Sequence, residues 1–176
     1  MSTVREAIEK RSSTRGFTEE KLTAEELETI LTAALQAPTA ANHKELHFTV
    51  VEGTNPLLTE IEEEKNRLRG ITDAPHNFYY EAPILIVISG EQGFRWTSLD
   101  AGIAVQNICL RAEELGLGSL IIGSIYDALR GEKKGYFEKY LQLPENHSYE
   151  IAVALGHKAV TKEPHDFIRE EQVTVL

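Results

Sequence analysis

Six consecutive residues near the start of the chain combine positive charge with hydroxyl groups. The segment 10–15 reads Lys-Arg-Ser-Ser-Thr-Arg and contains no acidic residue. Guanidinium groups pair with two phosphate oxygens at once and hydroxyls donate further hydrogen bonds, so this segment suits a phosphate group. A structural interpretation stays open, because cations are favoured at a helix C-terminus and Ser and Thr occur in many ordinary loops.

A second segment with possible chemistry, 37–42, reads Ala-Pro-Thr-Ala-Ala-Asn. Its small side chains would let the backbone approach a flat ligand closely, and Asn42 could donate and accept hydrogen bonds at the edge of a ring. The same residues would also serve as a plain connection from a helix to a strand.

Two further groups of residues carry a weaker signal. Gly123 ends the apolar run 120–122 and could bring the main chain against a cofactor ring, although a bulge or a simple strand end is the more ordinary explanation. Gln106 and Asn107 are polar residues in an apolar stretch and need partners when buried. Buried amides commonly find such partners within the protein itself.

Familiar catalytic and metal-binding patterns are absent from the sequence. The six histidines show no metal-ligand spacing, and the single cysteine, Cys109, lies in an apolar stretch where a structural thiol is expected. There is no nucleophile elbow and no Walker loop. We therefore predict no metal site, and no sequence pattern indicates a catalytic nucleophile.

Hydrophobic periodicity predicts the elements that must position these residues. Helices are expected over about 4–11, 23–36, 55–69 and 98–115, with a short helix around 127–141. Strands are expected over 47–52, 84–88, 120–122 and 149–155, and the continuous apolar run at 84–88 suits a strand buried on both faces. The segment after Gly156 lacks periodicity and is expected to form an extended arm. This alternation indicates an α+β or α/β fold with a central sheet.

The helix expected over 98–115 carries apolar residues around most of its circumference. They are Leu99, Ile103, Ala104, Val105, Ile108, Leu110 and Leu115. Such a helix must be buried on most sides. In a chain of 176 residues a second subunit is a natural source of that cover, so we expect a homodimer.

Length and charge narrow the class of protein. A chain of 176 residues with 41% hydrophobic residues suits a single domain that spans 1–176. Its net charge of −10 disfavours binding to nucleic acid or to anionic membranes. No apolar run approaches the roughly 20 residues that span a bilayer, and the N-terminus lacks the apolar stretch of a secretory signal. With one cysteine that has no internal partner, these features predict a cytoplasmic protein.

Taken together, five segments in order along the chain resemble the nitroreductase family of flavoenzymes. The segment 11–17 looks like the family's opening Arg-x-Ser-x-Arg/Lys-x-Phe, and 37–42 is similar to its Ala-Pro-Ser-x-x-Asn loop. The segment 82–87 is similar to the Ala-Pro-x-x-Ile/Val-x strand. Residues 100–102 with 106–107, and 115–119 with 122–123, look like the Asp-Ala-Gly, Gln-Asn, Gly-Leu-Gly and Ile-Gly motifs. Each motif is common alone, but all of them in this order are specific.

The resemblance implies a homodimeric α+β fold, a three-layer α/β/α sandwich with a central mixed sheet, and two FMN sites at the subunit interface. The phosphate and ribityl groups are expected to contact Arg11, Ser12, Ser13 and Arg15 of one subunit. The other subunit is expected to reach the same flavin through Pro38, Thr39, Ala40 and Asn42. The isoalloxazine ring is expected against Ile122 and Gly123, and looser matches add Asn77 and Arg169 as flavin contacts.

The activity that the resemblance implies is that of an FMN-dependent oxidoreductase. NADH or NADPH would reduce the flavin and leave, and a nitroaromatic, a quinone or a related acceptor would then occupy the same face, in a ping-pong mechanism. Two alternatives stay open: a specialised dehalogenase or flavin-degrading enzyme on the same fold, and a non-catalytic flavin-binding or regulatory module. At 44–46 the sequence has Lys-Glu-Leu in place of the family's Gln-Pro-Trp, so the substrate side is expected to differ.

Overall fold

The computed structural model describes residues 3–163, 166 and 169–176, with the backbone alone at residues 169 and 170. One sheet has the strand order β1-β2-β4-β3. Its strands are β1 (Leu46–Glu52), β2 (Ile84–Glu91), β3 (Leu117–Ile122) and β4 (His147–His157). All three neighbouring pairs are antiparallel. The expected mixed sheet is thus antiparallel in its four strands, and among the described residues its parallel component is one bridge, between Ser13 and Ser119.

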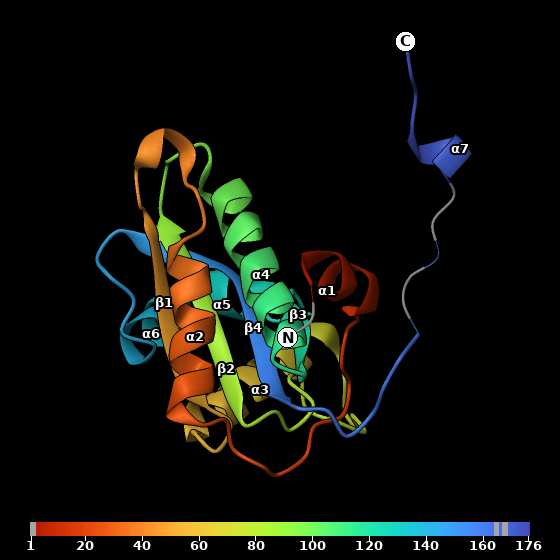
Figure 1. Ribbon diagram of the computed structural model, residues 1–176. Coiled ribbons are helices and arrows are strands. Elements are labelled where there is room, and N and C mark those ends of the chain that lie inside the picture. Colours follow the sequence, from red (N-terminus) through yellow and green to blue (C-terminus); the bar gives the residue numbers. More distant parts are fainter. Residues whose placement is uncertain (1–2, 164–165, 167–168) are drawn as a thin grey trace.

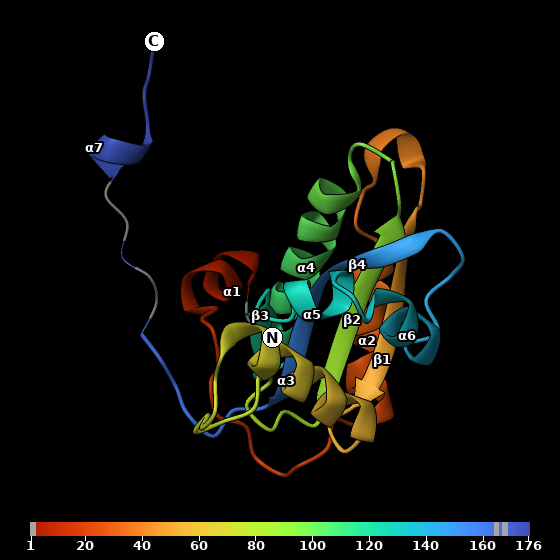
Figure 2. The same ribbon diagram turned by 180° about the vertical axis from the view of Figure 1, so that it is seen from behind.

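Helices cover both faces of this sheet and make the molecule three layers deep. On one face lie α2 (Ala24–Leu35) and α4 (Thr97–Glu114), with α1 (Val4–Lys10) packed against α4 (Figure 1). On the other face lie α3 (Pro56–Arg69), α5 (Tyr126–Arg130) and α6 (Lys134–Tyr140), which come to the front in Figure 2. The predicted α+β class and three-layer sandwich are confirmed.

Strand β2 lies inside the sheet and is buried on both of its faces, as its apolar run predicted. Leu85 and Val87 belong to the core on the α3 side, whereas Ile86 and Ile88 belong to the core on the α4 side. All four side chains are 0% exposed. One continuous run of apolar residues therefore joins the two cores through the sheet.

Helices α1 and α2 begin with the same capping device. The Thr23 hydroxyl accepts a hydrogen bond from the Glu26 N–H, and the Glu26 carboxylate accepts one from the Thr23 N–H. Thr3 and Glu6 repeat this reciprocal arrangement at α1. The predicted capping box of α2 is thus confirmed. The two segments that carry candidate chemistry, 10–15 and 37–42, each follow directly from the end of a helix that is fixed at its start.

The short helix predicted around 127–141 is wrong as one element, because the chain forms two helices there. Gly131 lies between α5 and α6 with φ −88° and ψ −149°, which is an extended conformation. A Cβ at this position would lie 2.6 Å from the Asp127 carbonyl oxygen, so the tight turn between the helices requires glycine. The break lets α5 pack on α3 and β4 while α6 follows its own direction.

The C-terminal segment leaves the body of the subunit after β4 (Figure 1). Its described part contains one short helix, α7 (Arg169–Gln172), and ends in the exposed side chains of Val173, Val175 and Leu176. The predicted arm is present, with one turn of helix within it. No helix among the described residues has both the length and the hydropathy needed to cross a lipid bilayer.

Helix α4 buries one face within the subunit and presents the other to solvent. Ala101, Ala104 and Ile108 are at most 1% exposed, whereas Leu99 is 59% exposed. Gly102 and Gln106 are also exposed, on the same side as Leu99. The sequence predicted that α4 is buried on most sides, and one chain alone does not bury it to that extent.

Candidate functional site

The basic segment 10–15 leaves α1 and runs along the outer edge of β3. Ser13 forms a parallel bridge with Ser119, and the Thr14 N–H donates to the Ser119 carbonyl at 3.0 Å. The Thr14 side chain is buried over Gly118, where a Cβ would lie 2.7 Å from the Thr14 hydroxyl oxygen. Glycine at 118 therefore permits this close approach, and the segment is fixed to the sheet.

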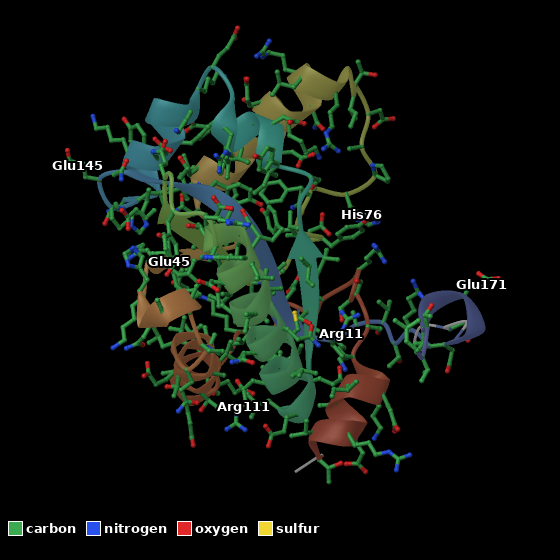
Figure 3. The ribbon with its side chains drawn as sticks, turned by 90° about the horizontal axis from the view of Figure 1, so that it is seen from above. Arg11, Glu45, His76, Arg111, Glu145 and Glu171 are labelled. Atoms are coloured by element: carbon green, nitrogen blue, oxygen red, sulfur yellow. The ribbon has the colours of Figure 1, made fainter. Side chains whose placement is uncertain are left out.

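Arg11 carries the least satisfied donor of this segment. Its Nη1 atom is buried and meets no hydrogen-bond acceptor. The guanidinium is close enough to Cys109 for its charge to oppose the rise in the pKa of that thiol, which burial causes. Figure 3 shows Arg11 beside β3. A buried N–H donor without an acceptor is costly, and an anion such as phosphate would satisfy it.

The other three predicted phosphate contacts lie in the same segment. Ser12 and Ser13 are half-buried and Arg15 is exposed. The four residues are thus neighbours along the edge of β3, with one half-buried cation, one exposed cation and two hydroxyls between them.

The loop after α2 adopts a backbone that side chains rarely tolerate. It contains the 3-10 turn η1 (Ala40–Asn42), and φ is +53° at Ala41, +57° at Asn42 and +59° at Lys44. Left-handed residues other than glycine cost about 1–3 kcal/mol each and occur where surrounding contacts enforce them. Such strain is typical of functional loops.

Contacts within the loop and outside it hold this strained backbone. The Thr39 hydroxyl accepts from the Lys44 N–H at 3.0 Å, and the Asp100 Oδ2 atom accepts from the Ala40 N–H at 2.8 Å. His43 lies 2.9 Å from a Glu91 oxygen and stacks on the Phe94 ring with 4.3 Å between the centroids. The exposed Asn42 and Pro38 are presented outward by a loop that is fixed at its base.

At the end of β3, the side chains of Ile121 and Ile122 point to opposite faces of the sheet, and the contact of Ile122 with a flavin ring stays a prediction. The Ile122 side chain is 3% exposed and lies in the core on the α3 side, so it faces away from the α4 side. Ile121 is 40% exposed and lines a cavity with residues of α4. Gly123 is exposed, and a Cβ there would meet only the Ile151 side chain, at 3.9 Å. A flat ring could approach the backbone here.

The cavity beside Ile121 has a volume of about 450 Å³. Its walls come from α4, α5 and β4, through Gly102, Gln106, Tyr126, Arg130 and Ile151 among others. Arg130 donates to a Glu150 oxygen at 3.0 Å and to the Tyr149 carbonyl at 2.8 Å, so its charge is paired. Sequence reasoning missed Ile121, Tyr126 and Arg130. The two-residue alternation along β3 would have indicated Ile121, because side chains of a strand alternate between its faces.

The two predicted flavin-binding segments lie far apart within one subunit. Segment 11–14 borders β3 at one edge of the sheet, whereas the loop 37–45 leads into β1 at the opposite edge (Figure 1). Both touch α4, but Arg11 is near Cys109 and the loop is bound to Asp100. Cys109 lies nine positions after Asp100 in the helix, which is about 14 Å along the helix axis.

Asn77 does not lie with the other predicted contacts within this subunit. The Asn77 side-chain oxygen accepts from the backbone N–H groups of Tyr79 and Glu81, so it closes a local turn. Asn77 lines a different cavity, of about 520 Å³, which includes no other predicted flavin contact. The side chain of Arg169 lies outside the described residues. Both residues stay predictions.

The departure from the family pattern at 44–46 places an acid in the protein interior. Glu45 is 4% exposed, and Leu46 begins β1. Among the described residues, no group of three or more His, Cys, Asp or Glu side chains is placed so that it could hold a metal ion.

Comparisons with known proteins agree with this geometry. The sequence model of the nitroreductase family matches residues 8–157, and the chain therefore belongs to this family. A nitroreductase from Desulfitobacterium hafniense DCB-2, solved with bound FMN, is similar with a TM-score of 0.89 and 28% identity over 100% of this chain and 99% of the other. A nitroreductase from Bacteroides fragilis NCTC 9343, also solved with bound FMN, has a TM-score of 0.87 and 27% identity, with both chains covered completely.

The chain is also similar to a curated reductase. The FMN reductase (NADPH) of Bacillus subtilis strain 168 is 28% identical over 177 aligned residues, which cover 90% of this chain and 67% of the relative. The family membership predicted from the five sequence motifs is confirmed.

Proposed function

We propose that the protein is an FMN-dependent oxidoreductase that takes electrons from NADH or NADPH and passes them to a small acceptor such as a nitroaromatic or a quinone. The observation that carries this proposal is the buried Nη1 atom of Arg11, which meets no acceptor. The relatives solved with FMN and the NADPH-linked relative support the choice of cofactor and reductant. When bound, FMN would supply the redox chemistry, and the protein would supply binding and orientation.

The phosphate end of FMN fits the segment beside β3. This segment combines Arg11, whose Nη1 atom is buried, with the hydroxyls of Ser12 and Ser13 and the exposed cation of Arg15. The doubly charged phosphate would complete the hydrogen bonding of Arg11, which protein groups leave unsatisfied. Riboflavin lacks this group and should bind far more weakly.

The ring end fits the region where β3 ends. The open backbone at Gly123 and the exposed Ile121 side chain provide one flat and apolar wall. The adjoining cavity of about 450 Å³ leaves space for an acceptor or a nicotinamide on the exposed side. Since reductant and acceptor would use the same space in turn, we infer a ping-pong order of reaction.

A homodimer would supply the part of the site that one subunit lacks. The loop with Pro38, Thr39, Ala40 and Asn42 lies at the sheet edge opposite Arg11, so a single chain does not bring both segments to one flavin. The exposed side of α4, with Leu99, offers an apolar surface for the second subunit. In a two-fold dimer each site receives residues from both chains.

The test is a titration of the purified protein with FMN and with riboflavin, followed by turnover with NADH and with NADPH against a quinone. We expect tight binding of FMN, weak binding of riboflavin, and turnover with at least one nicotinamide. Equal affinity for FMN and riboflavin would contradict the phosphate role of Arg11. Flavin binding without turnover would favour the non-catalytic alternative.

A further inference from the structure

Glu45 is a buried acid that lies directly after the strained loop. It is 4% exposed, and neither of its carboxylate oxygens meets a hydrogen-bond donor. Figure 3 shows Glu45 beside α4. An ionised carboxylate without a donor is very costly in the protein interior, and such a group commonly becomes neutral instead.

A second buried acid, Asp100 of α4, is 3% exposed and close enough to Glu45 to raise the pKa of its carboxyl. One Asp100 oxygen accepts the Ala40 N–H at 2.8 Å, and the residue lies in the first turn of α4. The N–H group and the positive end of the helix dipole both interact favourably with a carboxylate at this position. Asp100 is therefore suited to accept a hydrogen bond from Glu45.

We propose that Glu45 is protonated in the folded protein and donates a hydrogen bond to Asp100, so that the pair holds one negative charge and ties the loop 39–44 to α4. Glu45 would then act as a positioning residue, through Asp100 and the Ala40 N–H. The link to flavin rests on the proposed function, because this loop is the one expected to reach the flavin of the second subunit.

The charges that face the pair decide its response to pH. Burial is the largest cause that acts on the pKa of Glu45 and raises it, and the backbone N–H of Glu45 itself opposes this rise. The neighbouring Asp100 raises the pKa further, while His43 lowers it. Glu91 from the end of β2 pairs with His43 and so weakens that opposing effect. An acid with a raised folded pKa contributes stability that is complete below its unfolded pKa and lost as the pH rises through the folded pKa. Rising pH would therefore release the loop.

The direct test is an infrared spectrum of the protein at neutral pH. We expect a carbonyl band of a protonated carboxylic acid that disappears in Glu45→Gln and stays in Glu63→Gln, a control at an exposed acid of α3. The band should also vanish in Asp100→Asn, because the amide would donate to Glu45 and allow it to ionise. Absence of the band in the wild-type protein, or its persistence in Glu45→Gln, would overturn the proposal.

The second readout is the pH profile of FMN binding. If only the protonated form of Glu45 holds the loop, the FMN affinity of the wild-type protein should fall about tenfold for each pH unit above the pKa of Glu45. Glu45→Gln keeps a donor toward Asp100, so its FMN affinity should not change with pH over the same range. Parallel profiles in both proteins would contradict the positioning role.

Two controls distinguish a failure of the Glu45–Asp100 pair from a failure of the proposed function. A protein that shows the carbonyl band but binds no FMN would refute the proposed function and leave the acid pair intact. If Glu45→Gln fails to fold, the pH dependence of urea unfolding in wild-type and Asp100→Asn proteins replaces it. Only the wild-type protein should lose stability as the pH rises through the pKa of Glu45, and equal slopes would count against the pair.

Discussion

The two segments that we propose to hold FMN owe their conformations to different causes. Segment 11–14 lies along β3, where Ser13 pairs with Ser119, and none of its residues has a positive φ. The loop 39–44 contains three left-handed residues and depends on contacts with Asp100 and Glu91. Sheet pairing therefore fixes the first segment, and side-chain contacts fix the second. Mutations should accordingly act on binding in the first segment and on loop conformation in the second.

The largest expected effect on FMN binding is at Arg11. Arg11→Gln removes a charged donor that no protein group satisfies, and a hydrogen bond to a charged group contributes about 1.5–3 kcal/mol. We expect FMN affinity to fall about 10- to 100-fold in a fluorescence titration, with little change for riboflavin. Arg5→Gln, at an exposed arginine of α1 that pairs with Glu9, is the matched control. Equal losses in both variants would refute the specific role of Arg11.

A comparable effect on the loop should follow from Asp100→Ala. The variant leaves the Ala40 N–H without its acceptor, and loss of a buried partner costs about 1–3 kcal/mol. Urea unfolding should show this loss of stability, and FMN binding should weaken with it. Wild-type stability in Asp100→Ala would mean that Asp100 does not hold the loop.

Gly118→Ala tests whether the close contact between β3 and segment 11–14 is needed for FMN binding. The new methyl group would lie 2.7 Å from the Thr14 hydroxyl oxygen, and overpacking of a tight contact costs about 1–3 kcal/mol. Segment 11–14 should shift, so FMN binding should weaken without any change in charge. Gly135→Ala in α6 is the control, since a Cβ there meets no atom within 4 Å, and it should be neutral or stabilising by about 0.4–1 kcal/mol.

The smallest effect is expected at Glu64, a buried acid that contrasts with Glu45. Glu64 accepts from Arg67 and lies 2.9 Å from the Lys133 Nζ atom, and these partners lower its pKa to about 2. Its stabilisation is complete above the unfolded pKa and is lost as the pH falls through about 2. In Glu64→Gln, the free energy of unfolding measured in urea should therefore depend less on pH in the acid range. At neutral pH the variant should lose on the order of 1 kcal/mol of stability, since Arg67 and Lys133 are both half-exposed. An unchanged acid limb would show that the pairing is unimportant.

Local sequence patterns predicted most of the fold because their causes are local. The Thr23 capping box and the apolar run of β2 need only neighbouring residues to act. The break between α5 and α6 was missed, because a single Gly131 inside a helical pattern gives little signal until the Asp127 carbonyl is in place. Boundaries elsewhere agree within a few residues.

The sequence indicated which segments form the candidate site, but not how their side chains are arranged in space. The motifs indicated segment 11–15, yet nothing in the sequence showed that Arg11 turns its Nη1 atom into the protein. The contact of Glu45 with Asp100 joins residues far apart in the chain, and only the packed fold brings them together. The Ile-Gly motif indicated Ile122, but it did not show that the neighbouring Ile121 is the side chain exposed toward the α4 side.

The central claim, a flavin site shared between two subunits, is tested most directly by mixing two variants. Arg11→Gln removes the phosphate contact, and Asn42→Gly removes the loop side chain while tolerating the positive φ of +57°. Each variant alone should leave every site defective, so the FMN concentration is chosen such that neither homodimer retains flavin. After co-refolding in equal amounts, about half of the dimers are mixed, as mass spectrometry would verify. One site in each mixed dimer is then intact, so about a quarter of all sites should recover FMN. No recovery would contradict the shared site, because a site within one chain would keep one lesion everywhere.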